Sequence, residues 1–456
     1  MTVTSSKAEL THRRVLGVAF PILISNITTP ILGAVDTGVV GQLGEAAPIG
    51  AVGLGAIIIT SIYWFFGFLR MGTVGLTSQA LGAREFQEVD ALLARVLIAG
   101  VVFGLILILI QIPTFWIALA ILPGSAEVET LAQQYLGIRI WSAPAAVAIY
   151  GITGWLIAHE RMLAVLMIQF WTNGLNVILD IWFVLIFDWG VEGVAFATFM
   201  AEWSGALLGL FFCRKVLWRK GFVEWEQIFD WGRLLNMALV NRDILLRSLL
   251  LQIIFVSFIF LSAEHGDVTL AANQVLLQFL YVATFTLDGF AIAAETLVGQ
   301  AVGSRNLTFL RRSVLITFGW GLVMSIVLSV AFVVGGVQFI ELMTTASEVR
   351  EQAKAFLIWI FVAPIIGVWA WMLDGIFIGA TQTRDMRNMM GVSFIVYWIA
   401  VAVLLQVFGD HGLWAALVIS FLVRGISLGV CYSKIEAKCV GQPGGYAQNK
   451  ILQQKD

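Results

Sequence analysis

The sequence Gln-Ala-Leu-Gly-Ala-Arg occupies residues 79–84, and the related sequence Gln-Ala-Val-Gly-Ser-Arg occupies residues 300–305. Each follows a long apolar stretch. A second pair, Ala143-Pro144 and Ala363-Pro364, recurs at the same displacement of about 220 residues. One short match means little, because small residues are common in membrane helices. Two matches at one displacement predict that the chain contains a duplicated unit.

The composition around these repeats is that of a membrane protein. Of the 456 residues, 59% are hydrophobic and 12% are charged, and the mean hydropathy is +0.91. A soluble domain carries about 25% charged residues, so this chain could not cover its surface in water. The composition therefore excludes an ordinary soluble enzyme and a disordered protein. The net charge of −2 offers no basic face for nucleic acid.

The motifs of metal, disulfide and nucleotide chemistry are missing from the sequence. The three cysteines have no C-x-x-C spacing, and no two of the four histidines are four residues apart. We therefore expect no cofactor and no metal centre. There is no phosphate-binding loop and no nucleophile elbow, so ATP-driven pumping and enzymatic activity are not expected. The first apolar stretch, from Val15, is too long for a signal peptide and predicts a retained membrane helix.

A membrane-spanning helix needs about 20 apolar residues. With that length the sequence divides into twelve predicted spans: 14–41, 49–72, 89–112, 128–157, 163–187, 191–217, 240–263, 269–299, 311–336, 349–380, 387–408 and 412–433. Pro144 and Pro364 interrupt the fourth and tenth spans, where we expect kinked helices.

The charges between the spans predict the orientation. Basic residues concentrate in alternate connectors, for example at Arg84, Arg161 and Arg305, whereas the other connectors are mainly acidic. Because basic loops stay in the cytoplasm, both termini are predicted to be cytoplasmic, in a bacterial-type inner membrane. Six spans per repeat make the two units parallel. We expect an all-α membrane protein with twelve transmembrane helices, in two pseudo-symmetric six-helix lobes around a central cleft, as alternating access by a carrier requires.

The predicted lobes are bounded by polar segments. Residues 221–239 mix Trp225 and Trp231 with charges, which is typical of an interfacial helix, although a plain linker is the alternative. The predicted domains are a cytoplasmic tail (1–13), an N-lobe (14–218), a cytoplasmic interfacial linker (219–239), a C-lobe (240–434) and a disordered cytoplasmic tail (435–456).

Two carboxylates stand out in the first lobe, since ionisable groups inside a membrane are costly. Asp36 lies deep in the first span and Asp180 in the fifth. Asn176 and Asn173 precede Asp180 by four and seven residues, which places the three on one helix face. Asn26 and Thr198 are further hydrogen-bonding candidates. A buried carboxylate pair can load and release protons near neutral pH, so Asp36 and Asp180 are the predicted proton-coupling site.

Other polar residues in the spans are open to two interpretations. Asp288, Glu295 and Asp374 are the second-lobe candidates for a functional role. Asp288, and Glu202 in the first lobe, could instead pair with an arginine of the spans, which are Arg70, Arg139, Arg247 and Arg424. Pro21 precedes Asp36 by about four turns, and a proline can act as a helix hinge. It is either an ordinary entry proline or the point at which protonation of Asp36 bends the first span.

Taken together, these residues resemble the multidrug and toxic compound extrusion family and its DNA-damage-inducible F branch. The resembling stretches are Pro21–Asn26, Val35–Thr37, Gly72–Ala83, Asn176–Asp180, Gly193–Thr198, Asn241–Ile244, Leu287–Phe290 and Leu373–Thr381. The resemblance implies an exporter of cationic or amphipathic organic compounds, driven by protons or sodium. It also implies that Asp36 and Asp180 form the coupling site, that Asn176 and Thr198 are hydrogen-bond partners, and that the first helix bends at Pro21.

One departure from the family pattern concerns the coupling ion. Some relatives place a glutamate on the seventh span and an aspartate on the tenth, whereas here the seventh span offers Gln252 and Arg247, and Asp374 remains. This departure favours protons over sodium. The alternatives are a sodium-coupled exporter, a lipid-linked saccharide flippase, for which the spans carry few basic residues, and a membrane transferase, for which a DDxxD-like pair is missing. We expect the chain to act as a monomer within the bilayer.

Overall fold

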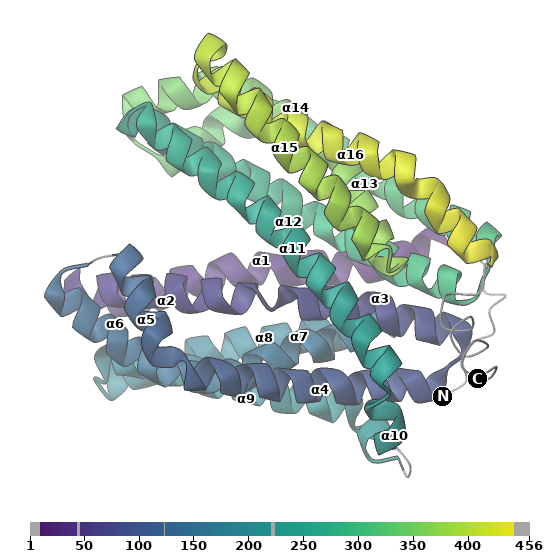
Figure 1. The fold of residues 1–456 in the computed structure, drawn as a ribbon. Coiled ribbons are helices and arrows are strands. Elements are labelled where there is room, and N and C mark those ends of the chain that lie inside the picture. The colour runs from purple at the N-terminus through teal and green to yellow at the C-terminus, as the bar shows by residue number, and fades with distance from the viewer. Residues whose placement is uncertain (1–9, 43–45, 123, 220–223, 442–456) are drawn as a thin grey trace. The chain divides into compact units, whose positions relative to one another are not determined.

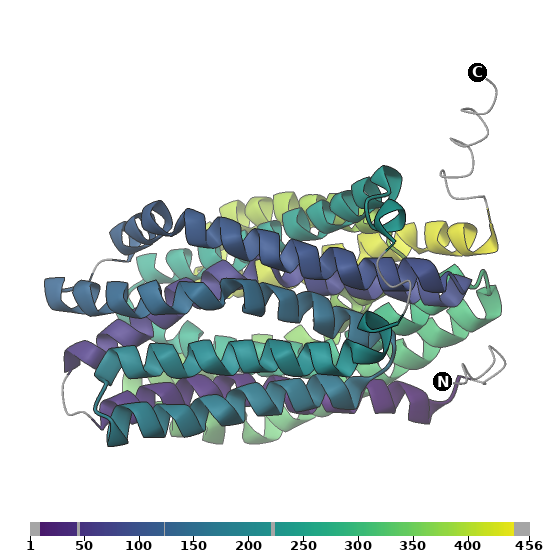
Figure 2. The same cartoon turned by 90° about the horizontal axis from the view of Figure 1, so that it is seen from below.

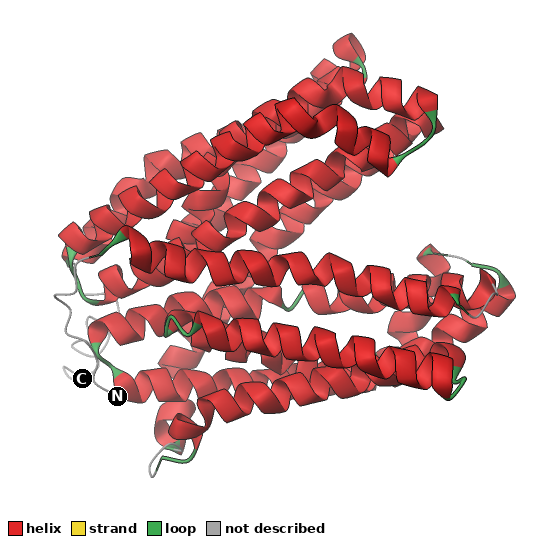
Figure 3. Ribbon diagram, turned by 180° about the vertical axis from the view of Figure 1, so that it is seen from behind, coloured by secondary structure: helices red, strands yellow, loops and turns green. Residues whose placement is uncertain are grey.

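The computed structural model describes residues 10–42, 46–122, 124–219 and 224–441. Within α1 the side chains of residues 27–34, 36, 37 and 40 lie outside this description. All regular elements of the described residues are helical (Figure 3). This confirms the predicted all-α membrane fold.

Figure 1 labels the helices in chain order. In the first half they are α1 (His12–Gly41), α2 (Ala46–Trp64), α3 (Gly67–Ala83), α4 (Phe86–Leu109), α5 (Gln111–Ile121), α6 (Ala126–Arg139), the short η1 (Ile140–Ser142), α7 (Ala143–Ala158), α8 (Met162–Asp180), η2 (Ile181–Ile186), α9 (Gly190–Leu217) and α10 (Trp225–Ile228). In the second half they are α11 (Trp231–Glu264), α12 (Asp267–Gly303), α13 (Leu307–Met343), α14 (Ser347–Gly379), α15 (Thr383–Phe408) and α16 (Asp410–Val440).

Eleven helical segments of the described residues are long and apolar enough to cross a membrane. They match the second to twelfth predicted spans in order. The helix α1 coincides with the first predicted span, 14–41. The hydropathy of the sequence therefore located every long helix, because a chain in lipid must satisfy its backbone hydrogen bonds within each helix.

The two interrupting prolines behave differently. Pro144 lies in the first turn of α7, directly after the break at η1. A proline is tolerated there because the first amide groups of a helix have no helical acceptor. Pro364 lies inside α14, which continues through it from Ser347 to Gly379. The predicted second span is divided into α2 and α3, and the connector after the third span contains the short helix α5.

Two predicted boundaries differ from the observed ones. The helix α11 begins at Trp231, so residues 231–239 of the predicted linker belong to the seventh spanning helix. At the other end α16 reaches Val440, six residues into the predicted disordered tail. Ile435 and Cys439, four residues apart, are fully buried there. Packing of this apolar pair extends the helix, and residues 442–456 lie outside the described part.

The described chain forms two compact units. One comprises residues 24–77 and 85–231, and the other comprises residues 1–23, 78–84 and 232–456. In the first unit α4 packs along α7, and α8 packs along α9 (Figure 1 and Figure 2). In the second unit α12 packs along α14. Gly375 of α14 permits this approach, because a Cβ there would be 2.5 Å from the carbonyl oxygen of Ala291.

The short helix α10 is anchored to its own unit by Arg95 of α4. The Nε of Arg95 donates to the carbonyl oxygen of Ile228 at 2.9 Å, and the same guanidinium pairs with Glu88 at 2.6 Å. Arg95 thus satisfies carbonyl groups at the C-terminus of α10, where a positive charge is favourable.

Candidate functional site

The helix α8 carries the polar face that the sequence predicted. Asp180 and Asn176 are fully buried, and Asn173 is 8% exposed. The opposite face of α8 exposes large apolar side chains, among them Leu163, Met167 and Phe170. A lipid-exposed apolar face and a buried polar face are the arrangement expected when a membrane helix turns its polar residues inward.

Thr198 of α9 completes this cluster by bonding to Asn176. The Nδ2 of Asn176 donates to Oγ1 of Thr198 at 3.0 Å, and the Thr198 hydroxyl donates to the carbonyl oxygen of Val194 at 3.0 Å. On the next turn, Nε2 of Gln169 donates to Oδ1 of Asn173 at 3.2 Å. Three of the predicted site residues, Asn173, Asn176 and Asp180, therefore share one face with Thr198 as a partner from the neighbouring helix.

Asp180 is the last residue of α8 before a change in helix type. Residues Ile181–Ile186 form a π-helix, η2. Gly193 of α9 packs closely here, since a Cβ would lie 3.2 Å from the backbone of Phe183. Wide π-helical turns are rare and are frequently found at functional sites. The sequence does not predict this feature, because Ile181–Ile186 is an uninterrupted apolar run with no local signal for a wider turn.

The first helix is described only in part. Asp36 lies in α1, and its side chain lies outside the described residues. Asn26 is half-buried in the same helix. The helix is continuous through Pro21, and the boundary between the two compact units falls between Leu23 and Ile24, two residues after this proline.

Another acid of the first unit has an arginine partner. Glu202 of α9 receives two hydrogen bonds from Arg139, at 2.8 and 3.0 Å. Arg139 also donates to Ser142 at 2.9 Å, and the Tyr63 hydroxyl donates to the carbonyl oxygen of Arg139 at 3.1 Å. This network joins α2, α6 and α9. Of the two roles that the sequence left open for Glu202, the structure therefore shows the structural one, an ion pair with an arginine.

In the second unit Asp374 lies between two arginines. Its Oδ2 accepts a hydrogen bond from Arg247 of α11, and Nη2 of Arg424 from α16 is 3.6 Å from the same oxygen. Arg247, Asp374 and Arg424 are 8%, 4% and 1% exposed. Two guanidinium groups and one carboxylate make this cluster positive, so its charge disfavours a bound cation.

The remaining second-lobe candidates lie on α12. Asp288 is half-buried, and Glu295 is 3% exposed. No three His, Cys, Asp or Glu side chains of the described residues are grouped as a metal site would require. The expectation that the protein has no cofactor stays a prediction.

Many apolar spans and a buried polar cluster on the face of one spanning helix are features of a polytopic membrane transporter. The chain belongs to the MatE family, whose sequence model matches residues 21–182 and 244–404. These stretches begin in corresponding parts of the two halves, in agreement with the internal repeat. Members of this family, the multidrug and toxic compound extrusion proteins, are transporters and not enzymes.

Individual relatives and solved structures agree with this assignment. The chain is 36% identical over 436 residues to DNA damage-inducible protein F of Escherichia coli (strain K12), covering 95% of this chain and 93% of that protein. It is 25% identical to Multidrug and toxin extrusion protein 1 of Danio rerio, covering 88% and 68% of the two chains. The predicted resemblance to the family and to its DNA-damage-inducible F branch is confirmed.

The fold is shared with crystal structures of the family. A MATE protein in the bent conformation superimposes with a TM-score of 0.85 at 18% identity, covering 93% of this chain and 96% of that one. The Vibrio cholerae transporter VcmN in the bent form gives 0.83 at 19% identity, covering 94% and 97%.

Proposed function

We propose that the protein is a proton-coupled exporter of cationic or amphipathic organic compounds. Protons entering at Asp36 and Asp180 exchange for a substrate that leaves the cell by alternating access. The observation that carries this proposal is the placement of Asp180. Its carboxyl group is fully buried at the end of a spanning helix, next to the Asn176–Thr198 pair and directly before a π-helix.

Two other acids of the spans have arginine partners, and these pairs support this choice. Glu202 pairs with Arg139, and Asp374 pairs with Arg247. An arginine already balances the charge of each carboxylate, so neither acid requires a proton or a metal ion to remain buried. Glu202 and Asp374 therefore have a structural role that requires no coupling ion, and the positive charge of the cluster at Asp374 favours protons over sodium as the coupling ion.

Bending of α1 at Pro21 is the proposed mechanical step. A proline removes one backbone hydrogen bond and allows a helix to bend at low cost. Pro21 lies two residues before the point at which α1 passes from one compact unit to the other. Protonation of Asp36 would change its hydrogen-bond partners and so shift α1 between a straight and a bent state.

The proposed substrates follow from the relatives. Probable multidrug resistance protein NorM of Bacillus anthracis is 21% identical over 435 residues, and its name describes multidrug resistance. One proton charge moving through about 150 mV supplies roughly 3.5 kcal/mol. That energy supports a gradient of a neutral substrate of about 300-fold without ATP. We place the protein in the bacterial inner membrane with both termini cytoplasmic, as the basic connectors predict.

The test is transport by purified protein in liposomes. Efflux of a fluorescent organic cation is measured with an imposed pH gradient, with and without sodium. We expect the pH gradient alone to drive efflux, and Asp36→Asn and Asp180→Asn to abolish it while the protein elutes as a folded species. Asp188→Asn is the matched control, because Asp188 is exposed and has a φ of 57°, which asparagine also tolerates.

The same assay separates the alternatives. Efflux that requires sodium and ignores the pH gradient would contradict proton coupling and indicate a sodium-driven exporter. Normal drug resistance together with pH-driven transport by Asp36→Asn would contradict the proposed site.

A further inference from the structure

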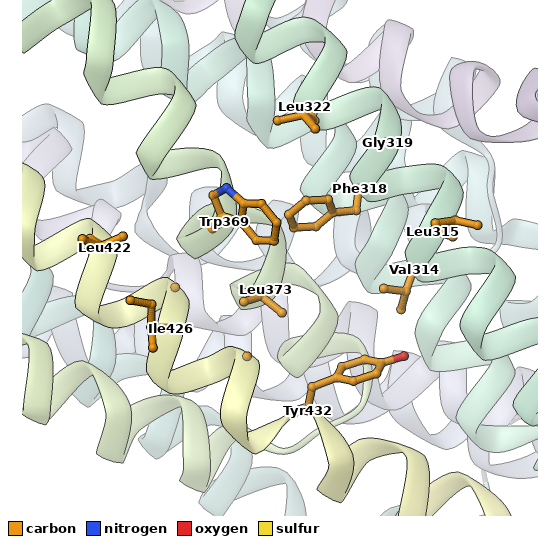
Figure 4. Close-up of a pocket in the computed structure, with 12 residues that line it drawn as sticks. Val314, Leu315, Phe318, Gly319, Leu322, Trp369, Leu373, Leu422, Ile426 and Tyr432 are labelled. Carbon is orange, nitrogen blue, oxygen red and sulfur yellow. The ribbon is translucent and has the colours of Figure 1, made fainter.

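An apolar groove lies on the second compact unit between α13, α14 and α16. Its volume is about 810 Å³. Figure 4 shows Leu322 at one end and Tyr432 at the other, with Leu373 between them. Phe318 and Trp369 both line the groove, with ring centroids 4.6 Å apart. The groove is open to the outside, since Leu315 is 74% and Ile426 is 59% exposed.

Glycines create the space in this groove. Gly319 of α13 and Gly429 of α16 both line it, and a Cβ at either position would have no neighbouring atom within 4 Å. Gly425 allows α16 to approach α14, because a Cβ there would be 2.9 Å from Cβ of Trp369. Side chains from two helices therefore form the walls, and α14 forms the floor.

One end of the groove is polar and basic. Arg311 lies one turn before Val314 on α13, and Glu436 lies one turn after Tyr432 on α16. Arg311 joins the two helices through two contacts of 2.8 Å to Glu436. Arg312, the next residue, is exposed as well. This end therefore presents two guanidinium groups, one carboxylate and the Tyr432 hydroxyl.

We propose that this groove binds an anionic phospholipid of the surrounding bilayer, with one acyl chain along Leu322, Leu373 and Val314 and its phosphate at Arg311 and Arg312. The lining is apolar along the whole groove, as an acyl chain requires. The net positive charge lies at one end only, which is the charge pattern complementary to an anionic lipid.

The length of the groove agrees with this occupant. Val314 and Leu322 are eight residues apart on α13, which corresponds to about 12 Å along the helix. Half of a hydrocarbon core of about 30 Å is about 15 Å. A lipid of one leaflet would thus reach the end of the groove with its chain while its headgroup stays at the level of the arginines.

The test compares retained lipids by native mass spectrometry. The full-length protein is reconstituted with equal amounts of phosphatidylglycerol and phosphatidylcholine, extracted, and the bound lipids are counted. We expect the wild type to retain phosphatidylglycerol preferentially. Arg312→Gln should weaken its retention about fivefold, the factor expected for one interfacial basic residue. Gly429→Leu should also reduce its retention, because the new side chain occupies the space of the acyl chain.

Matched controls separate occupancy of the groove from general effects. Gly335→Leu adds a side chain to open space elsewhere on α13, and Lys215→Gln removes an exposed basic residue from α9. Both should retain phosphatidylglycerol like the wild type. Gly319→Leu fills the groove from its other wall. It replaces Gly429→Leu as the test of groove occupancy if Gly429→Leu does not fold.

Two results would overturn the proposal. The first is equal retention of both lipids by the wild type, which would mean that the groove has no preference for an anionic headgroup. The second is wild-type retention of phosphatidylglycerol by folded Gly319→Leu or Gly429→Leu. That result would mean that phosphatidylglycerol does not occupy the groove.

Discussion

Gly303 at the end of α12 lies directly against the backbone carbonyl of Gln79 in α3. The reciprocal contact is present as well, since Gly82 lies against the backbone of Gln300. These four residues are the glutamines and glycines of the repeated hexapeptides. The repeat has a structural reason, because each glycine lets its helix approach the backbone of the other motif more closely than any side chain would allow.

We therefore expect Gly303→Ala to destabilise the protein. A Cβ at this position would overlap the Gln79 backbone, and backbone cannot yield as a flexible side chain does. Overpacking of this kind costs about 1–3 kcal/mol. The thermal midpoint of the detergent-solubilised protein measures the effect. Gly335→Ala is the control, because a Cβ there meets no atom within 4 Å. Equal midpoints for the two variants would show that the contact does not constrain the fold.

The Asn176–Thr198 hydrogen bond should matter more for transport than for stability. Asn176→Ala removes one hydrogen bond worth about 1 kcal/mol. We expect pH-driven efflux to fall at least about fivefold, because the amide lies one turn from Asp180, while the protein still folds. Gln169→Ala, which removes the neighbouring bond to Asn173, should transport like the wild type. Equal losses in the two variants would argue against a special role for Asn176.

The charges around Asp374 predict how strongly two substitutions lower the thermal stability of the protein. Asp374→Asn leaves Arg247 and Arg424 buried without their shared carboxylate, and an uncompensated buried charge costs about 3–5 kcal/mol. Arg247→Gln should cost less, because Arg424 is 3.6 Å from the same oxygen and can take its place. Thermal midpoints should therefore rank the wild type above Arg247→Gln and Arg247→Gln above Asp374→Asn. Arg242→Gln is the control, because that side chain is 54% exposed.

A pH effect on stability is expected from His159, which lies between α7 and α8. Burial lowers the pKa of His159 to about 4, and Arg161 adds to the lowering. The imidazole packs on Trp155 with centroids 3.7 Å apart. The unfolded chain has a histidine pKa of about 6.5, so between pH 6.5 and 4 only the unfolded state binds this proton. His159 therefore makes the protein less stable as the pH falls through this window.

His159→Gln tests this effect, since glutamine cannot be protonated. The thermal midpoint of the variant should fall less than that of the wild type between pH 6.5 and 4. His265→Gln, at an exposed position, should keep the wild-type dependence. A wild-type slope in His159→Gln would show that other groups cause the acid sensitivity.

Much of the fold was predictable from the sequence because a membrane restricts the possibilities. Runs of about 20 apolar residues must be helical, and the sequence located the second to twelfth spans for that reason. The repeat at Gln79 and Gln300 indicated the duplication, and the spacing of Asn173, Asn176 and Asp180 indicated their common face. These inferences depend only on local composition and on the period of a helix.

The partners of the charged residues required the tertiary structure. Glu202 and Arg139 are 63 residues apart, and Asp374 and Arg247 are 127 residues apart. No local periodicity encodes which arginine meets which acid, because such pairing depends on how distant helices pack. The π-helix after Asp180 and the groove between α13 and α16 also depend on how helices pack against each other. The sequence alone determined the helices and their polar faces, and only packing between helices decided which buried acids have an arginine to balance their charge.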